Sequence, residues 1–136
     1  MIKRFGSVLV LACGLVAVSG CCGAGKKLKE CAEMTKTINE GITKAKAITV
    51  TPATIASFGK VYEETGEKVA KLDISTPEIK AEQAEYVAMT KELAKATKDA
   101  ASAGASKAKN DVAMDEIKKA AKHESEIVNK LNKTCH

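Results

Sequence analysis

The chain has 136 residues, which is the length of one ordinary domain. Lys and Arg together number 22 and Asp and Glu 17, so the formal net charge is +5, and aromatic residues make up only 3%. This length excludes a two-domain enzyme, and the shortage of aromatic side chains speaks against a large aromatic-lined ligand pocket.

The first 20 residues have the pattern of an export signal. Lys3 and Arg4 supply a positive start, and an apolar run of 14 residues extends from Phe5 to Val18. This run matches the apolar region of a signal peptide and is shorter than the ~20 residues that a helix needs to cross a bilayer. We therefore predict that residues 1–20 are a removed signal peptide, in preference to a permanent membrane helix.

The end of this segment, Val18-Ser19-Gly20-Cys21, resembles the bacterial lipobox. In lipoproteins with that motif an aliphatic residue and two small residues precede a cysteine. The resemblance implies that the Cys21 thiol receives a diacylglyceryl group, that a peptidase cuts before it, and that the new amino terminus is acylated with palmitate-type chains. Each buried CH₂ contributes about 0.8 kcal/mol, so two or three chains would hold the protein on a bilayer.

The residues around Cys21 leave a second cleavage site open and suggest which membrane holds the protein. Ordinary secretory cleavage after Ser19 is the rival interpretation. Cys22 is a weaker lipid acceptor, because Cys21 would then occupy a position that prefers Ala, Gly or Ser. In lipoproteins of enterobacterial type an Asp after the lipidated cysteine marks inner-membrane retention. Here that residue is Cys22, so the resemblance implies the outer membrane, facing the periplasm.

The remaining chain does not resemble a nucleic-acid-binding protein. Arg4 is the only arginine, so lysine supplies all the positive charge after residue 20, and the net charge falls from +5 to +3 when Lys3 and Arg4 leave. Lysine lacks the bidentate geometry that favours arginine in base and phosphate recognition. Phe58, Tyr62 and Tyr86 are too few for a base-stacking platform.

Four later segments carry apolar residues at alternating spacings of three and four, which predicts helices. We expect a flexible lipid-anchored tether over residues 21–25 and a helical bundle over 26–136. The expected helices span residues 26–47, 52–72, 77–103 and 106–134. The apolar stripes are Leu28, Cys31, Thr35, Ile38, Ile42 and Ala45; Ile55, Phe58, Tyr62, Thr65, Val69 and Leu72; Ile79, Tyr86, Met89, Leu93, Ala96 and Ala100; and Ala113, Ile117, Ala120, Ile127, Leu131 and Cys135.

Two of the three breaks between these helices are strong. Thr51-Pro52 and Thr76-Pro77 each combine an N-cap residue with a proline at the first helical position. The third break rests on Gly104, which costs about 1 kcal/mol inside a helix. Local propensity alone would therefore allow one long helix from Pro77 to Thr134.

The cysteines favour four helices over three. With Cys13 in the signal and Cys21 lipidated, Cys22, Cys31 and Cys135 remain, in a compartment where disulfides persist. Four antiparallel helices return Cys135 to the end that holds Cys31. A single helix from residue 77 to 134, ~87 Å long, would separate them by far more than the ~7 Å a disulfide allows. We predict an all-α, antiparallel up-down four-helix bundle with a Cys31–Cys135 disulfide.

Cys22 is then an unpaired thiol. It precedes Gly23-Ala24-Gly25 in the expected tether. An interchain disulfide, a small-thiol cap and a free thiol all stay open.

Few residues suggest chemistry. His123 and His136 are the only histidines, and the paired ligand spacings of a di-iron bundle are absent. Glu124 falls on the apolar stripe of the last helix. It is either a buried acid with a raised pKa or a carboxylate paired with a Lys or Thr of a neighbouring helix.

The expected length and topology also resemble the periplasmic b-type cytochromes, and the segment Ser75–Lys80 adds to the likeness. That resemblance implies Met34 and His123 as iron ligands. However, they lie ~4.5 Å and ~18 Å along the bundle from the cysteine pair, so they cannot face one iron. The ending Cys135-His136 resembles a covalent haem site, but Asn132 stands where its first cysteine belongs. We predict no cofactor.

We therefore expect a non-enzymatic lipoprotein of the small helical envelope type, acting as a structural or protein-interaction module. Its partners would be the lipid bilayer, through Cys21, and an envelope protein or a second copy of itself. The alternative is a small-ligand or haem-type cofactor carrier, because Ala45, Ala96 and Ala100 leave room inside the bundle. An enzyme is disfavoured because no nucleophile–base pair or metal set can be assembled.

Overall fold

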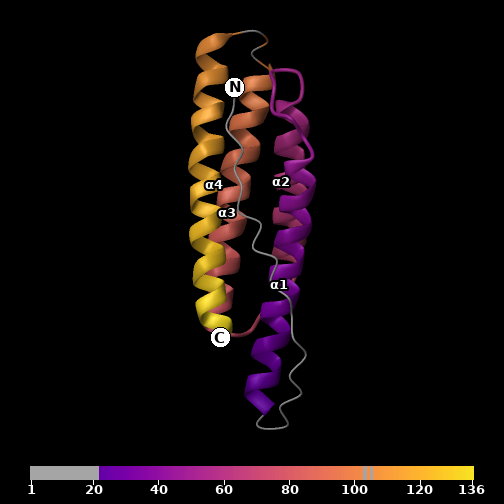
Figure 1. Ribbon diagram of the computed structural model, residues 1–136, viewed down its shortest axis with the longest axis vertical. Helices are drawn as coiled ribbons and strands as arrows, with labels where there is room; N and C mark the ends of the chain where they lie inside the picture. Colours follow the sequence, from indigo (N-terminus) through magenta and orange to yellow (C-terminus); the bar gives the residue numbers. More distant parts are fainter. Residues whose placement is uncertain (1–21, 103, 105) are drawn as a thin grey trace.

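The computed structural model describes residues 22–102, 104 and 106–136. The predicted signal peptide and Cys21 lie outside them. Over the described residues the chain forms four helices and no strand: α1 (Cys22–Lys46), α2 (Ile55–Ala70), α3 (Pro77–Ser102) and α4 (Lys107–Cys135). Consecutive helices run in opposite directions (Figure 1), and α1 packs on α4 as well as on α2. The predicted antiparallel four-helix bundle is confirmed.

The weakest predicted break is a real one. α3 ends at Ser102 and α4 begins at Lys107, so a continuous helix from Pro77 does not form. Gly104 adopts a φ of +61°, in the left-handed region that favours glycine. A glycine thus occupies the position between the two helices where a positive φ is required.

The start of α2 differs from the expectation. The helix begins at Ile55, three residues after Pro52. The Thr54 hydroxyl donates to the Thr49 carbonyl at 2.6 Å and accepts the Thr51 N–H at 2.9 Å. These bonds close a separate turn before the helix, a local competition with helical geometry that threonine side chains permit.

The start of α1 differs as well. α1 begins at Cys22, so residues 22–25, which we predicted to be a flexible tether, are helical. Leu28, which we placed on the buried stripe, is 55% exposed. At 100° per residue, Leu28 lies about 120° around α1 from the fully buried Met34, so it is displaced from the packed face of the helix.

Most of the other predicted stripe positions line the core or its edge; Thr35 and Ala96 are only partly buried, and the predicted stripes left out the buried Met34, Thr90, Ala94 and Thr97. Most of the stripe positions are buried: Cys31, Ile38, Ala45, Ile55, Phe58, Tyr62, Thr65, Val69, Ile79, Tyr86, Met89, Leu93, Ala100, Ala113, Ala120, Ile127 and Leu131. Ile42, Leu72, Ile117 and Cys135 are partly buried against them. The 3.6-residue periodicity therefore located the buried face of each helix within the bundle.

Helices α2 and α3 approach each other most closely at two glycines. A Cβ atom on Gly59 would overlap the side chain of Thr97, and one on Gly66 would overlap that of Thr90. Both threonine hydroxyls donate to carbonyls of their own helix, at 2.9–3.0 Å for Thr97 and 3.0 Å for Thr90. These buried polar groups are therefore satisfied without a partner on α2, and the two backbones can pack tightly.

The contact between Gly59 and Thr97 predicts the effect of one added methyl group. Gly59→Ala should destabilise the protein by about 1–3 kcal/mol, because the core must shift to admit it. Gly25→Ala is the matched control: nothing lies within 4 Å of its Cβ position, and alanine favours the helix by up to about 1 kcal/mol. Urea unfolding would measure both. A Gly59→Ala protein as stable as the wild type would contradict the close packing.

Candidate functional site

The predicted disulfide is present. Cys31 in α1 and Cys135, the last residue of α4, are bonded, with their Cα atoms 5.9 Å apart. The bond joins residues 104 positions apart in the chain. Closing a loop of that size contributes up to ~4.7 kcal/mol when the unfolded chain is the reference. The disulfide therefore ties the first helix to the last at one end of the bundle.

Glu30, beside Cys31, makes a second link at this end. Its side chain is 3% exposed. Its carboxylate accepts the Ser75 N–H at 3.0 Å, the Ser75 hydroxyl at 2.8 Å and the Thr76 N–H at 3.0 Å. These donors lie just before α3, where free N–H groups and the helix dipole favour an anion. Hydrogen bonds from Thr76 and Ser75 lower the pKa of Glu30 to about 2.

Gln83 of α3 makes a third link. Its side-chain amide donates to the Val69 carbonyl at 2.7 Å and to the Leu72 carbonyl at 3.0 Å. These carbonyls lie at the carboxyl end of α2 and in the turn that follows it. Each also accepts a backbone N–H, from Leu72 to Val69 at 3.2 Å and from Ile74 to Leu72 at 3.0 Å, so the Gln83 amide adds a second donor to both. We call the Cys31–Cys135 disulfide, Glu30 and Gln83 together the clamped end. The disulfide joins α1 to α4, Glu30 joins α1 to the start of α3, and Gln83 joins α3 to the end of α2. The clamped end therefore connects all four helices.

A further polar cluster lies in the core. Tyr62 of α2 and Tyr86 of α3 both donate to Glu124 of α4, at 3.1 Å and 3.0 Å. Burial raises the pKa of Glu124, against the opposing effect of the two phenol hydrogen bonds. Burial also raises the pKa values of both tyrosines, so they stay protonated and remain donors.

The structure thus places Glu124 in the core with a raised pKa, but its partners are tyrosines and not the Lys or Thr that we expected. Both carboxylate oxygens are occupied by Tyr62 and Tyr86. The cluster joins three helices, and its polar atoms bond to each other. We therefore assign it to holding α2, α3 and α4 in register.

The two residues considered as iron ligands have separate environments. Met34 is fully buried in the core. His123 is partly exposed, and its Nε2 lies 2.6 Å from Glu85 Oε1 on α3. Glu85 Oε2 in turn lies 3.0 Å from Lys130 Nζ. His123 therefore belongs to a surface polar cluster with Glu85 and Lys130, between α3 and α4.

The described part of the chain contains no group of three His, Cys, Asp or Glu side chains placed to hold a metal ion. Within the same residues, no helix is both long and apolar enough to cross a membrane. An open groove of about 510 Å³ lies between the end of α3 and the start of α4. Charges of both signs line it, together with Val112, which is 63% exposed.

The predicted site residues near the amino terminus are only partly described. Cys21 lies outside the described residues. Cys22 is the first residue of α1, which places it about 13 Å along the helix from Cys31. Sequence reasoning missed Glu30 and Gln83. The Ser75-Thr76-Pro77 signal marks the start of a helix, but nothing local indicates which distant carboxylate caps it.

Comparison with known proteins adds no assignment. No family model matches the chain, and no curated protein or solved structure matches it significantly.

The hydrogen bonds of Glu30 predict a pH-dependent contribution to stability. Its folded pKa of about 2 lies below the ordinary value of 4.5, so its contribution is present above pH 4.5 and is lost as the pH falls towards 2. Glu30→Gln should therefore have a lower urea midpoint than wild type at pH 7, and the difference should narrow over that acidic range.

Glu33→Gln is the control, because Glu33 is exposed and, among the described residues, its one ion-pair partner is Lys29, 3.9 Å away. It should leave the midpoint nearly unchanged. A difference between wild type and Glu30→Gln that stays constant from pH 7 to the acid limit would refute the assigned role of the Glu30 charge.

Proposed function

We propose that this protein is a lipid-anchored bacterial envelope lipoprotein that acts as a non-enzymatic structural or protein-interaction module. Cys21 would carry the acyl chains, and the bundle would extend from the outer membrane into the periplasm. The observation that carries the proposal is the continuity of α1. It begins at Cys22, directly after the predicted lipid acceptor, and runs without a break into the clamped end.

This continuity matters mechanically. A flexible tether would let the bundle reorient freely, whereas a helix transmits the position of its first turn to the rest of the molecule. From Cys22 to Cys31 the rise is about 13 Å, and the 29 residues of α4 span about 44 Å. With its helices perpendicular to the membrane, the module would present the α3–α4 connection roughly 55 Å from the lipid, and the α1–α2 connection would begin about 36 Å from it.

The interior favours a module of this kind over a carrier of a ligand or cofactor. Tyr62, Tyr86 and Glu124 fill the middle of the core and satisfy one another. The lysines and the remaining acids lie mostly on the outside, several of them in ion pairs between neighbouring turns. A mixed, charged exterior of this kind suits contact with an envelope protein or with another copy of the chain. We assign no role in nucleic-acid binding.

The intact mass of protein purified from membranes tests the anchor. We expect the mass of residues 21–136 plus acyl chains, with Cys31 and Cys135 resistant to alkylation until a reductant is added. Cys21→Ser should lose the acyl mass and Cys22→Ser should keep it. A soluble, unacylated wild-type protein would contradict the proposed lipid anchor.

A further inference from the structure

The amino-terminal turns of α1 carry an unusual charge pattern. No acidic residue occupies the first turn, and Lys26, Lys27 and Lys29 follow it. These lysines lie beyond the first turn, to which the effect of the helix dipole is largely confined. They give this end of α1 a local excess of positive charge. We call Lys26, Lys27 and Lys29 the basic collar.

Little in the fold neutralises the basic collar. Glu30, the next acid along α1, is buried and bonded to the start of α3. Glu33 lies 3.9 Å from Lys29 and is the one ion-pair partner of the collar in the described residues. The collar therefore presents its positive charge to the surroundings.

An exposed apolar side chain lies within the basic collar. Leu28, inside the collar, is one of two large hydrophobic side chains that are exposed in the described part of the chain. It is 55% exposed, and the first turns of α1 extend past the carboxyl end of α4 (Figure 1). An exposed leucine among lysines can place its apolar side chain at a lipid–water interface while the ammonium groups stay in the headgroup region.

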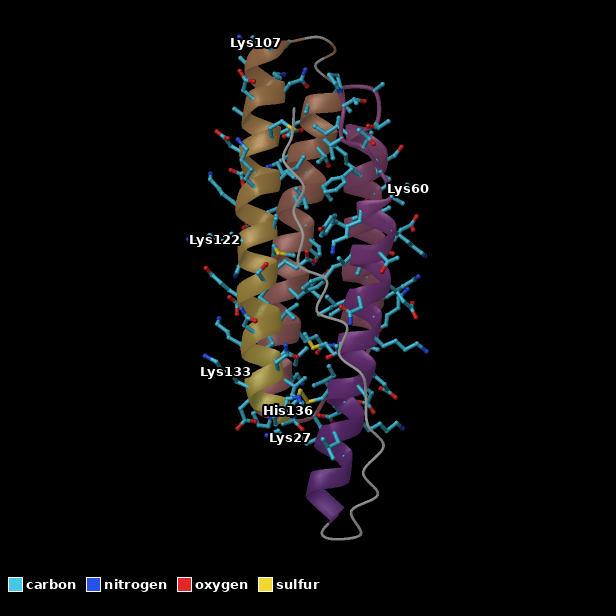
Figure 2. All side chains as sticks on the ribbon, in the orientation of Figure 1. Lys27, Lys60, Lys107, Lys122, Lys133 and His136 are labelled. Atoms are coloured by element: carbon cyan, nitrogen blue, oxygen red, sulfur yellow. A yellow bond between two sulfur atoms is a disulfide. The ribbon has the colours of Figure 1, made fainter. Side chains whose placement is uncertain are left out.

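The collar also lies close to the predicted anchor. Lys29 is seven residues after Cys22, which corresponds to about 10 Å of helix. That is comparable with the screening length of ~8 Å at physiological ionic strength. Figure 2 shows Lys133 and His136 near Lys27, at this same end of the molecule, while Lys107 lies at the opposite end.

We propose that the basic collar contacts anionic phospholipid headgroups of the membrane that holds the acyl chains, with Leu28 at the interface. This inference rests on the proposed lipid anchor. Positive groups beside an anionic membrane are attracted to it, and the headgroup phosphates would also complement the dipole at the start of α1. Contact at both the anchor and the collar would fix the angle at which the bundle leaves the membrane.

Lysine labelling on vesicles tests the contact. The full acylated protein would be reconstituted in phosphatidylcholine vesicles, with or without phosphatidylglycerol, and treated with an amine-reactive reagent. We expect Lys26, Lys27 and Lys29 to react at least about threefold more slowly when phosphatidylglycerol is present. Molar salt should abolish the protection, and Lys60 and Lys107 should react equally in both vesicles.

Charge-removing variants distinguish an effect of the basic collar from an effect of the overall positive charge of the protein. Lys26→Gln/Lys27→Gln/Lys29→Gln should abolish the phosphatidylglycerol-dependent protection of residues 22–29 from hydrogen exchange. The matched Lys60→Gln/Lys107→Gln/Lys122→Gln variant should retain it. The mass of the amino-terminal peptide reports acylation in the same samples. If the peptide is acylated but its lysines react at the same rate with and without phosphatidylglycerol, the proposed headgroup contact is wrong and the proposed anchor still stands.

Discussion

The Cys31–Cys135 disulfide is the constraint on which the arrangement of this bundle depends. It joins Cys31, in the third turn of α1, to the final residue of α4, so α2 and α3 lie within the loop that it closes. The core between them includes many small side chains, such as Ala45, Ala100 and Ala113. Small side chains bury little apolar surface, so a covalent link at one end has a large relative effect on stability.

Two buried carboxylates hold helices together in different ways, because their surroundings shift their pKa values in opposite directions. Glu30 faces backbone N–H groups and a hydroxyl at the start of α3, which stabilise its charge and lower its pKa. Glu124 faces two phenols in the core, where burial raises its pKa. The first fixes the clamped end as an anion. The second joins three helices at mid-bundle, where a charge is costly.

The sequence predicted the parts of this structure that local patterns encode. Helical spacing identified the buried faces, Thr76-Pro77 placed the start of α3, and the parity of antiparallel helices paired Cys31 with Cys135. Contacts that need the register between helices were out of reach. Glu30 meets Ser75 across 45 positions, and Tyr62 meets Glu124 across 62. Likewise, Leu28 fits a spacing of three to Cys31, but the structure buries Met34 and Ile38 on a face of α1 from which Leu28 is displaced.

We infer that the Cys31–Cys135 disulfide stabilises the contact between α1 and α4. That contact is important for the proposed function because the lipid anchor would be connected to the bundle through α1. The most direct measurement is urea unfolding of the purified protein, oxidised and reduced, followed by circular dichroism. We expect the reduced protein to lose up to ~4.7 kcal/mol of stability. Cys31→Ser/Cys135→Ser should match the reduced protein, and Cys22→Ser should match the oxidised one. Equal midpoints for oxidised and reduced protein would contradict this account.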